Sequence, residues 1–361
     1  MKILQIISSL GEGGAEKLLL DSIPLYIQQG IDMDLLVLNG DEYPFLQELK
    51  KKGVHIYSLS KGPMKKIYNP MHIFKIIPYL RRYDIAHVHL FPELYWVALA
   101  KILSNSSIKL LHTEHNVTNR RRKDFLLKRI DKYIYKKYDL IISITDEVNN
   151  NLKKHLNIND NNKFYVINNG INISQFIQKI ESHNIERTNK ILIQISRFKS
   201  QKDQDTVIKA LQYLPEYVKL YLVGDGERRN ECEILSKQLN LSHRVKFLGI
   251  RTDVAELLKS ADITLLSSYY EGLSLSSLEC MASGKPFIAS DVPGLRDIVQ
   301  DAGILFPQGD EKKLAQCIND LLKDKNYYNE VSSKCIERAK QYDINKMIDK
   351  YVEIYNRIGF I

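Results

Sequence analysis

Short apolar runs alternate with longer amphipathic stretches along the first half of the chain. The runs fall at residues 2–8, 34–38, 54–58, 85–90, 108–113 and 139–144. A short apolar run bounded by polar residues is typical of a strand buried on both faces of a parallel sheet. Because the stretches between the runs have helical spacing, we predict a doubly wound parallel sheet with helices on both faces.

A second alternating series follows. Its apolar runs lie at 190–196, 219–223, 245–247, 262–267, 286–290 and 303–305. The polar segment 168–189 separates the two series and is interpreted as a linker. Residues 344–358 then carry apolar positions at helical spacing and predict an amphipathic helix. The chain is therefore predicted to be an α/β protein with two Rossmann-like domains, which suits its 361 residues.

One stretch after the apolar run 263–266 predicts a strand, a tight turn and a helix in succession. Ser274 suits the N-cap of this helix and Gly284 suits the position past its C-terminus, and apolar residues between them recur three and four positions apart. The free amide groups at the helix start, from Leu273 to Ser276, form a ready site for an anion.

Two carboxylates flank that helix start. Glu271 lies in the turn and Glu279 lies a turn or more into the helix. Each could accept hydrogen bonds from hydroxyls on either side of an anion, which is the layout of a nucleotide sugar with its ribose, diphosphate and sugar. The alternative is a turn residue and a solvated helix residue, and the spacing alone favours neither interpretation.

The sequence from Glu271 to Pro286 resembles the signature of the retaining, GT-B-fold glycosyltransferases of family 4. The resemblance implies that Glu279 holds the ribose and that Glu271 contacts the donor sugar. It also implies that the turn between them binds the donor, through Gly272, Leu273 and Ser274.

The same resemblance implies a domain plan. Residues 1–170 would bind the acceptor and residues 171–343 the nucleotide-sugar donor, and the two domains would face each other across a cleft. The final helix, within 344–361, would pack back on the first domain. The chemistry would be sugar transfer with retention of anomeric configuration.

Two cations follow the first strand of the second domain. Arg197 and Lys202 keep the spacing of the family pattern G-R-x4-K-G, whereas Ser196 and Asp203 replace both glycines. Two cations beside a helix start are enough to offset the roughly −2 charge of a diphosphate, so we expect catalysis without a metal. The donor would be UDP-linked by resemblance, and no cofactor is expected.

Glycine-rich turns follow other predicted strands. Gly13 and Gly14 stand in a loop where Glu16 replaces the third glycine of a dinucleotide fingerprint, so that interpretation is weak. By resemblance this loop lines the donor phosphate and acceptor. Gly224 and Gly249 would likewise shape the pocket for the base and phosphates.

The segment His112-Thr113-Glu114-His115-Asn116 follows the apolar run that starts at 108. It resembles the family's T-x-H position, where His115 aligns and would hydrogen-bond the donor sugar or the acceptor. His112 remains the alternative. A lone D-x-D pair, Asp32 and Asp34, precedes a strand and is interpreted as a solvated turn, because ligands of open α/β sheets bind at the carboxyl ends of strands.

The net charge of +9 is unevenly distributed. Residues 119–138 carry +7 and residues 61–83 carry +6, which leaves −4 on the remainder. The segment 120–137 predicts a basic amphipathic helix that starts with Arg120, Arg121, Arg122 and Lys123. Its apolar residues Leu126, Ile130, Tyr133 and Ile134 have helical spacing. Such a helix either packs with a charged outer face or lies on an anionic membrane.

Because this charge lies in the domain expected to bind acceptor, we predict a carbohydrate or lipid-linked acceptor, in bacterial cell-surface polysaccharide or glycolipid synthesis. No aromatic-interleaved platform accompanies the charge, so nucleic acid is not expected as a partner. The four cysteines form no CxxC pair and no apolar run reaches membrane-spanning length, which favours a cytoplasmic protein, peripheral on the membrane face. The alternatives are a GT-B nucleotide-sugar epimerase or phosphorylase, or a non-catalytic nucleotide-binding protein.

Overall fold

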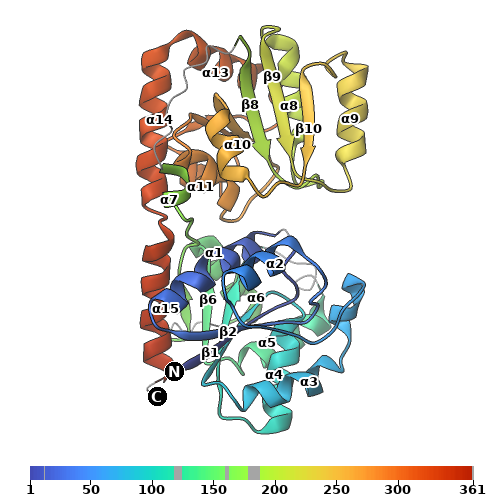
Figure 1. The fold of residues 1–361 in the computed structure, drawn as a ribbon, viewed down its shortest axis with the longest axis vertical. Coiled ribbons are helices and arrows are strands. Elements are labelled where there is room, and N and C mark those ends of the chain that lie inside the picture. The colour runs from blue at the N-terminus through green and yellow to red at the C-terminus, as the bar shows by residue number, and fades with distance from the viewer. Residues whose placement is uncertain (12, 118–123, 159–161, 178–187, 360–361) are drawn as a thin grey trace. The chain divides into compact units, whose positions relative to one another are not determined.

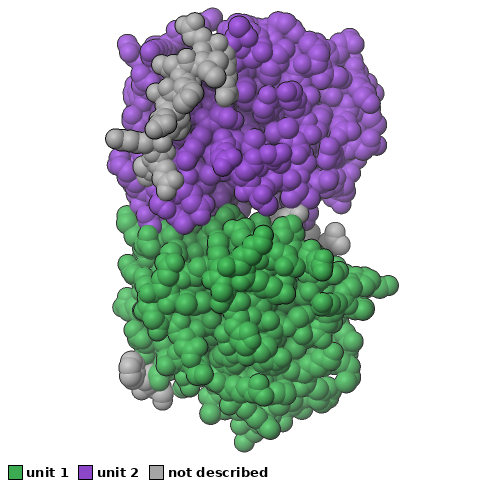
Figure 2. All heavy atoms as spheres, viewed as in Figure 1, with its two compact units in different colours: residues 1–170, 344–361 green, residues 171–343 purple. Residues whose placement is uncertain are grey.

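A computed structural model describes residues 1–11, 13–117, 124–158, 162–177 and 188–359. The chain forms two compact units, one of residues 1–170 and 344–361 and the other of residues 171–343 (Figure 2). Each unit holds one sheet in which the paired strands are parallel. The predicted fold class, two doubly wound parallel-sheet domains, is confirmed.

Unit 1 contains a seven-stranded sheet in the order β3-β2-β1-β4-β5-β6-β7. Its strands are β1 (Lys2–Ile7), β2 (Asp32–Val37), β3 (Ile56–Ser58), β4 (Ile85–His89), β5 (Lys109–Glu114), β6 (Leu140–Ser143) and β7 (Phe164–Val166). Its helices are α1 (Gly14–Gln28), α2 (Pro44–Lys51), η1 (Met64–Tyr68), α3 (His72–Leu80), α4 (Glu93–Ser104), α5 (Phe125–Tyr135), α6 (Asp146–Leu156) and α15 (Ile344–Gly359). Figure 1 labels most of these elements.

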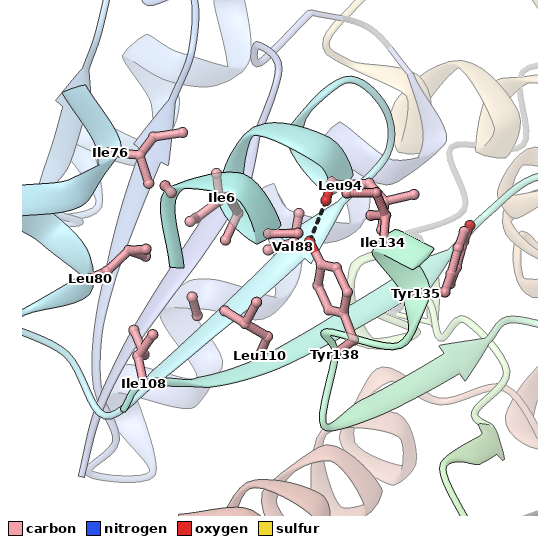
Figure 3. Packing of buried hydrophobic residues seen from close by; sticks show 14 of the residues in the cluster. Ile6, Ile76, Leu80, Val88, Leu94, Ile108, Leu110, Ile134, Tyr135 and Tyr138 are labelled. Atoms are coloured by element: carbon pink, nitrogen blue, oxygen red, sulfur yellow. Dashed lines mark hydrogen bonds between the residues drawn. The ribbon is translucent and has the colours of Figure 1, made fainter. Parts of the chain in front are cut away.

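Helices cover both faces of this sheet. α3, α4 and α6 pack their apolar sides on one face, and α5 adds Ile134 and Tyr135. Leu110, Val88 and Leu94 belong to the same buried cluster (Figure 3). Tyr138 spans this cluster and donates a hydrogen bond to the Leu94 carbonyl oxygen, 2.8 Å away. Each buried aliphatic side chain of this cluster contributes roughly 1.5–3 kcal/mol to the stability of the fold. α1 contacts α2 and α15.

Unit 2 contains a six-stranded sheet in the order β10-β9-β8-β11-β12-β13. Its strands are β8 (Lys190–Ile195), β9 (Val218–Val223), β10 (Val245–Gly249), β11 (Ile263–Leu266), β12 (Phe287–Ser290) and β13 (Ile304–Phe306). Its helices are α7 (Ser174–Ile177), α8 (Gln204–Ala210), η3 (Leu211–Tyr213), α9 (Arg229–Gln238), α10 (Val254–Ser260), α11 (Leu275–Ala282), α12 (Arg296–Val299), α13 (Glu311–Lys323) and α14 (Lys325–Lys340).

Several expectations about local structure were wrong. Strand β7 was not expected, because three residues are too few for a pattern. The expected linker contains helix α7, and residues 178–187 lie outside the described residues. Asp32 and Asp34 begin strand β2 and are not in a turn. Asp34 accepts a hydrogen bond from the Tyr83 hydroxyl, so its side chain has a structural partner.

Helix α15 belongs to unit 1 although it ends the chain. Its buried side recurs at helical spacing and includes Met347, Ile348, Tyr351 and Tyr355. Both tyrosine hydroxyls enter hydrogen bonds with polar side chains of β1, β4 and β5. The helix is therefore joined to the sheet of unit 1 by polar contacts as well as by apolar packing.

Candidate functional site

In unit 2 the strand order reverses between β8 and β11, which lie side by side in parallel. Helices that follow such neighbouring strands leave in opposite directions, so a crevice opens at the carboxyl ends of the two strands. The loop after β8 contains Arg197 and Lys202, and the loop after β11 contains Glu271. The two predicted motifs therefore come together at the place where open α/β sheets bind ligands.

Backbone and side-chain hydrogen bonds tie these two loops together. The amide of Asp203 donates to the Ser267 carbonyl at 3.1 Å, and the Ser267 hydroxyl donates to the Asp203 carboxylate at 3.0 Å. The amide of Tyr269 donates to the Gln201 carbonyl at 2.9 Å. Asp203 also caps α8 by accepting from the Thr206 amide. These contacts explain why an aspartate can replace the glycine of the family pattern here.

The predicted cation and carboxylate of this site are directly paired. The Lys202 ammonium donates to Oε1 of Glu271, and both side chains are largely buried. The Ser268 hydroxyl donates to the same oxygen at 2.6 Å. Arg197, by contrast, is exposed and its side chain makes no hydrogen bond or ion pair with the described residues. One of the two predicted cations is therefore held by protein, and the other faces solvent.

Helix α11 begins as the sequence predicts. The Ser274 hydroxyl caps it by accepting from the Ser277 amide at 3.3 Å. The amides of Leu275 and Ser276 donate no hydrogen bond within the described residues. These are the first-turn groups that an anion can use. Glu279 lies one turn further along and is 8% exposed.

Two glycines of unit 2 allow backbones to approach closely. Gly224 has a φ of +125°, and a Cβ there would lie 2.2 Å from the Ser196 carbonyl oxygen. Its amide donates to the Gly249 carbonyl at 2.8 Å, which places both predicted glycines at the ends of β9 and β10. Gly294 has a φ of +81°, and its Cβ would lie 2.3 Å from the Glu271 carbonyl oxygen.

Gly294 was not predicted as a site residue. The residues from Val292 to Asp297 have the composition of a turn, and nothing in the sequence links that turn to Glu271. Its proximity comes from the pairing of β12 with β11, which brings the loops after the two strands together. The Pro293-Gly294 dipeptide is the one local signal, because it marks a backbone that needs a positive φ.

In unit 1, the predicted glycines lie at the start of α1. Gly13 is the N-cap residue in an extended conformation, and Gly14 is the first residue of the helix. A Cβ at Gly13 would collide with the carboxylate of Glu16. Glu16 therefore folds back over the helix start, where negative charge is stabilised.

The two candidate histidines of unit 1 lie in different environments. The sequence suggested that His112 follows the strand. Strand β5 continues to Glu114, however, so His112 lies inside the strand. His112 is 1% exposed and its Nδ1 lies 3.0 Å from the Val88 carbonyl oxygen. His115 directly follows the strand and is half-buried. Its position at the carboxyl edge of the sheet is that expected for a ligand-binding residue.

His115 contacts a second buried histidine. Its Nε2 lies 3.1 Å from Nδ1 of His89, the last residue of β4. Burial lowers the pKa of His115 to about 4, although the Glu114 carboxylate acts in the opposite direction. Burial also lowers the pKa of His89 well below its usual value. Both rings are therefore neutral at neutral pH.

The predicted basic helix is shorter than expected. α5 begins at Phe125, where Asp124 caps it by accepting from the Leu126 and Leu127 amides. Arg120, Arg121, Arg122 and Lys123 lie outside the described residues. The predicted apolar face is largely exposed: Ile134 is buried, but three other predicted members are not, namely Leu126, Ile130 and Tyr133.

The inward side of α5 carries a polar residue. Asp131 is 1% exposed and accepts hydrogen bonds from the Tyr95 hydroxyl and, at 2.9 Å, from Nε2 of His155. Because these contacts hold that side against the unit, the apolar residues turn outward. Phe125 and Leu126 are 72% and 66% exposed. Helix α5 therefore presents apolar side chains beside its basic ones.

The second basic segment shares this property. Of the eighteen large hydrophobic side chains that are exposed in the described part of the chain, eight lie in the two basic segments, at Met64, Tyr68, Met71, Phe74, Phe125, Leu126, Ile130 and Tyr133. The Tyr68 ring lies 6.1 Å from that of Phe91, which lies 5.2 Å from that of Tyr95 on α4. Since Tyr95 bonds to Asp131, a chain of contacts joins the segments. We call these eight residues, together with the lysines and arginines of the two basic segments, the apolar-basic surface.

No helix among the residues that the structure describes is long and apolar enough to cross a bilayer. Over the same residues, no group of three or more histidine, cysteine, aspartate or glutamate side chains is arranged to hold a metal ion.

Comparisons with known proteins identify the class. A family model described as glycosyl transferases group 1 matches residues 175–342, and one described as glycosyltransferase family 4 matches residues 12–175. The fold is similar to that of Anabaena HepE in complex with UDP and glucose, with a TM-score of 0.85, 22% identity and 99% coverage of each chain. The family models and the fold thus define a glycosyltransferase with the GT-B fold.

Two curated relatives place it more narrowly. The chain is 30% identical over 284 residues to the N-acetyl-alpha-D-glucosaminyl L-malate synthase of Bacillus anthracis, covering 75% of this chain and 74% of that protein. It is 26% identical over 303 residues to the UDP-Gal:alpha-D-GlcNAc-diphosphoundecaprenol alpha-1,3-galactosyltransferase of Escherichia coli, covering 76% and 75%. The chain belongs to the group 1, family 4 glycosyltransferases.

Proposed function

We propose that the enzyme transfers a sugar from a nucleotide-diphosphate sugar, UDP-linked, to a carbohydrate or lipid-linked acceptor with retention of configuration. The observation that carries the proposal is the convergence of Arg197, Lys202, Glu271 and the start of α11 at one edge of the unit 2 sheet. The UDP-sugar donor and diphospho-undecaprenol acceptor in the name of the Escherichia coli relative support this substrate class.

Each group has a chemical role in the proposal. The amides of Leu275 and Ser276 bind the diphosphate, and Arg197 and Lys202 stabilise the charge that develops on it as the glycosidic bond breaks. Glu279 accepts hydrogen bonds from the ribose, and Glu271 accepts from the sugar. No metal is assigned a step. The departing phosphate takes the proton of the attacking acceptor hydroxyl. Departure of the phosphate and attack by the hydroxyl therefore take place on the same face of the sugar.

Alanine substitution tests these roles. Glu279→Ala and Lys202→Ala should each lose most donor-dependent transfer while the fold survives. Glu256→Ala and Lys199→Ala remove the same charges from exposed positions and serve as matched controls. Unchanged turnover in both site variants would refute the site. Product analysis with and without acceptor separates transfer from epimerisation, phosphorolysis and binding without turnover.

The acceptor side of the proposal concerns the apolar-basic surface. We propose that it docks unit 1 on an anionic membrane, at the cytoplasmic face, where lipid-linked acceptors are reached. Exposed apolar side chains insert at the level of the headgroups, and each nearby Lys or Arg adds about 1 kcal/mol on an anionic surface. The two segments that form the surface carry +7 and +6 of the net charge.

Vesicle sedimentation tests the docking. The protein should bind phosphatidylglycerol-containing vesicles more strongly than neutral ones, and high salt should weaken the binding. The pair Phe125→Ser and Leu126→Ser should reduce it several-fold. The pair Tyr217→Ser and Ile234→Ser removes apolar side chains of 45% exposure from unit 2 and should not. Equal binding to neutral and anionic vesicles at low salt would contradict the proposal.

A further inference from the structure

A line of hydrogen bonds runs from His115 through unit 1 to its C-terminal helix. His115 Nε2 lies 3.1 Å from His89 Nδ1, and His89 Nε2 lies 2.8 Å from Gln5 Oε1. The Gln5 amide nitrogen donates to the Tyr355 hydroxyl of α15 at 3.0 Å. Gln5, His89 and Tyr355 are buried, so water does not compete for these bonds.

The orientation of the Gln5 amide follows from its other neighbour. Gln5 Nε2 lies 3.6 Å from Sδ of Met33 as well as 3.0 Å from the Tyr355 hydroxyl. A thioether sulfur can accept a hydrogen bond and cannot donate one. The NH₂ end of the amide therefore belongs on this side, and the carbonyl oxygen Oε1 faces His89.

That orientation determines the proton position on His89. Oε1 of Gln5 only accepts, so His89 Nε2 carries the proton and donates it. Burial keeps His89 neutral, since it lowers the pKa of the ring well below its usual value, and the neighbouring His87 and His115 act in the same direction. A neutral imidazole has one N–H, so His89 Nδ1 bears a lone pair.

The same reasoning extends to His115. Its Nε2 faces the lone pair of His89 Nδ1 and therefore carries a proton. The ring is neutral at neutral pH, so its Nδ1 bears a lone pair. Within the described residues no side chain or backbone group hydrogen-bonds that nitrogen, and the ring is half-buried.

We propose that Gln5 and His89 are positioning residues that hold His115 as the Nε2–H tautomer, so that its Nδ1 accepts a hydrogen bond from a hydroxyl of the sugar ligand. That the ligand is a sugar rests on the proposed function, whereas the tautomer rests on unit 1 alone. A hydroxyl can donate to this nitrogen, and a group that only accepts cannot. His115 thus selects for a ligand that presents a hydrogen-bond donor to its Nδ1.

Nitrogen-15 NMR of the full-length protein tests the tautomer directly. Long-range proton–nitrogen correlations distinguish Nε2–H from Nδ1–H in a neutral histidine, and a His115→Gln variant assigns the signal. At pH 7 we expect His115 to be the Nε2–H form. An Nδ1–H form, or a charged ring, in the wild type would overturn the proposal.

Variants of His89 test the relay. His89→Leu removes the acceptor, so His115 should become a mixture of tautomers and kcat/KM for transfer should fall about tenfold. His89→Asn restores an acceptor oxygen and should recover part of both. His72→Leu is the matched control, because His72 is equally buried in unit 1 but lies on α3, where its ring contacts the Lys66 carbonyl oxygen. Its His115 signal should stay that of the wild type.

The outcomes separate this proposal from the proposed function. A wild-type Nε2–H signal that is lost in His89→Leu supports the relay even if no donor is turned over. Sugar transfer with an unchanged His115 tautomer in His89→Leu would contradict the relay and leave the transferase function standing. If His89→Leu does not fold, the wild-type spectrum and His89→Asn still decide the matter.

Discussion

Lys202 and Glu271, 69 residues apart in the chain, form an ion pair in which Lys202 donates to the carboxylate oxygen that also accepts from Ser268. Both side chains come from loops at the reversal of strand order in unit 2. The lysine proposed to face a diphosphate is thus held by the carboxylate proposed to face a sugar. We predict that donor binding exchanges one partner of Lys202 for another.

The exchange predicts different behaviour for the two partners. Lys202→Met should weaken the binding of UDP alone by about 10- to 100-fold, since a charge-assisted hydrogen bond to phosphate is lost. Glu271→Gln should leave UDP affinity equal or tighter, because Lys202 is released and UDP lacks the transferred sugar that Glu271 would contact. The same variant should lose transfer. Calorimetry with UDP and turnover with a UDP-sugar measure the two effects.

Lys199→Met is the control for this prediction. It removes the same charge from an exposed position on the same loop and should change UDP affinity little. Equal losses of UDP affinity in Lys202→Met and Glu271→Gln would show that the pair acts only to hold the loops together.

Gly294 supports Glu271 through close backbone contact. We predict that Gly294→Ala displaces the Glu271–Gly272 turn, because the new Cβ would lie 2.3 Å from the Glu271 carbonyl oxygen. Transfer should fall at least tenfold. Gly309→Ala has a similar positive φ of +76° but open space around it, so it should cost only the roughly 1–2 kcal/mol of a left-handed backbone and keep activity. Thermal melting and transfer rates compare the two, and equal activity losses would contradict the prediction.

Glu93 makes the stability of unit 1 depend on pH. It is 0% exposed at the start of α4, and neither carboxylate oxygen has a hydrogen-bond partner in the described structure. Burial raises the pKa of Glu93 from its ordinary 4.5 to about 8, although the nearby Ser8 hydroxyl acts in the opposite direction. Between pH 4.5 and about 8, Glu93 therefore keeps a proton in the folded protein that it releases in the unfolded chain.

The sign of the effect follows. The stability that the protonated Glu93 contributes is fully present below pH 4.5 and is lost as the pH rises through about 8. Between those values the free energy of unfolding falls by about 1.4 kcal/mol per pH unit. Glu93→Gln cannot ionise, so its melting temperature should gain on that of the wild type between pH 5 and 8. The exposed Glu42→Gln should run parallel to the wild type. A parallel course for Glu93→Gln would count against a buried, protonated carboxyl.

Much of the local structure at the site could be predicted. Ser274 and Gly284 bracket α11 as their side-chain chemistry requires, since a hydroxyl caps a helix start and glycine adopts the positive φ of +76° found after its end. The helix α15 could be predicted from its apolar spacing alone. These features depend on residues a few positions apart, which the sequence displays directly.

Other features could not be predicted because they depend on distant residues. The outward apolar side of α5 follows from the bonds of Asp131 with Tyr95 and His155, which come from α4 and α6. Amphipathic spacing identifies an apolar side but not the side that faces the core.

By itself, the sequence determined that this protein has two doubly wound parallel-sheet domains and a family 4 glycosyltransferase motif, because strand and helix periods and short-range motifs are local properties of the chain. Only the tertiary structure decided that Lys202 is paired with Glu271, that Gly294 supports the same turn, and that His115 is bonded through His89 and Gln5 to Tyr355. These partners lie on different strands and helices. Sheet order and register bring them together, and no spacing along the chain records that contact.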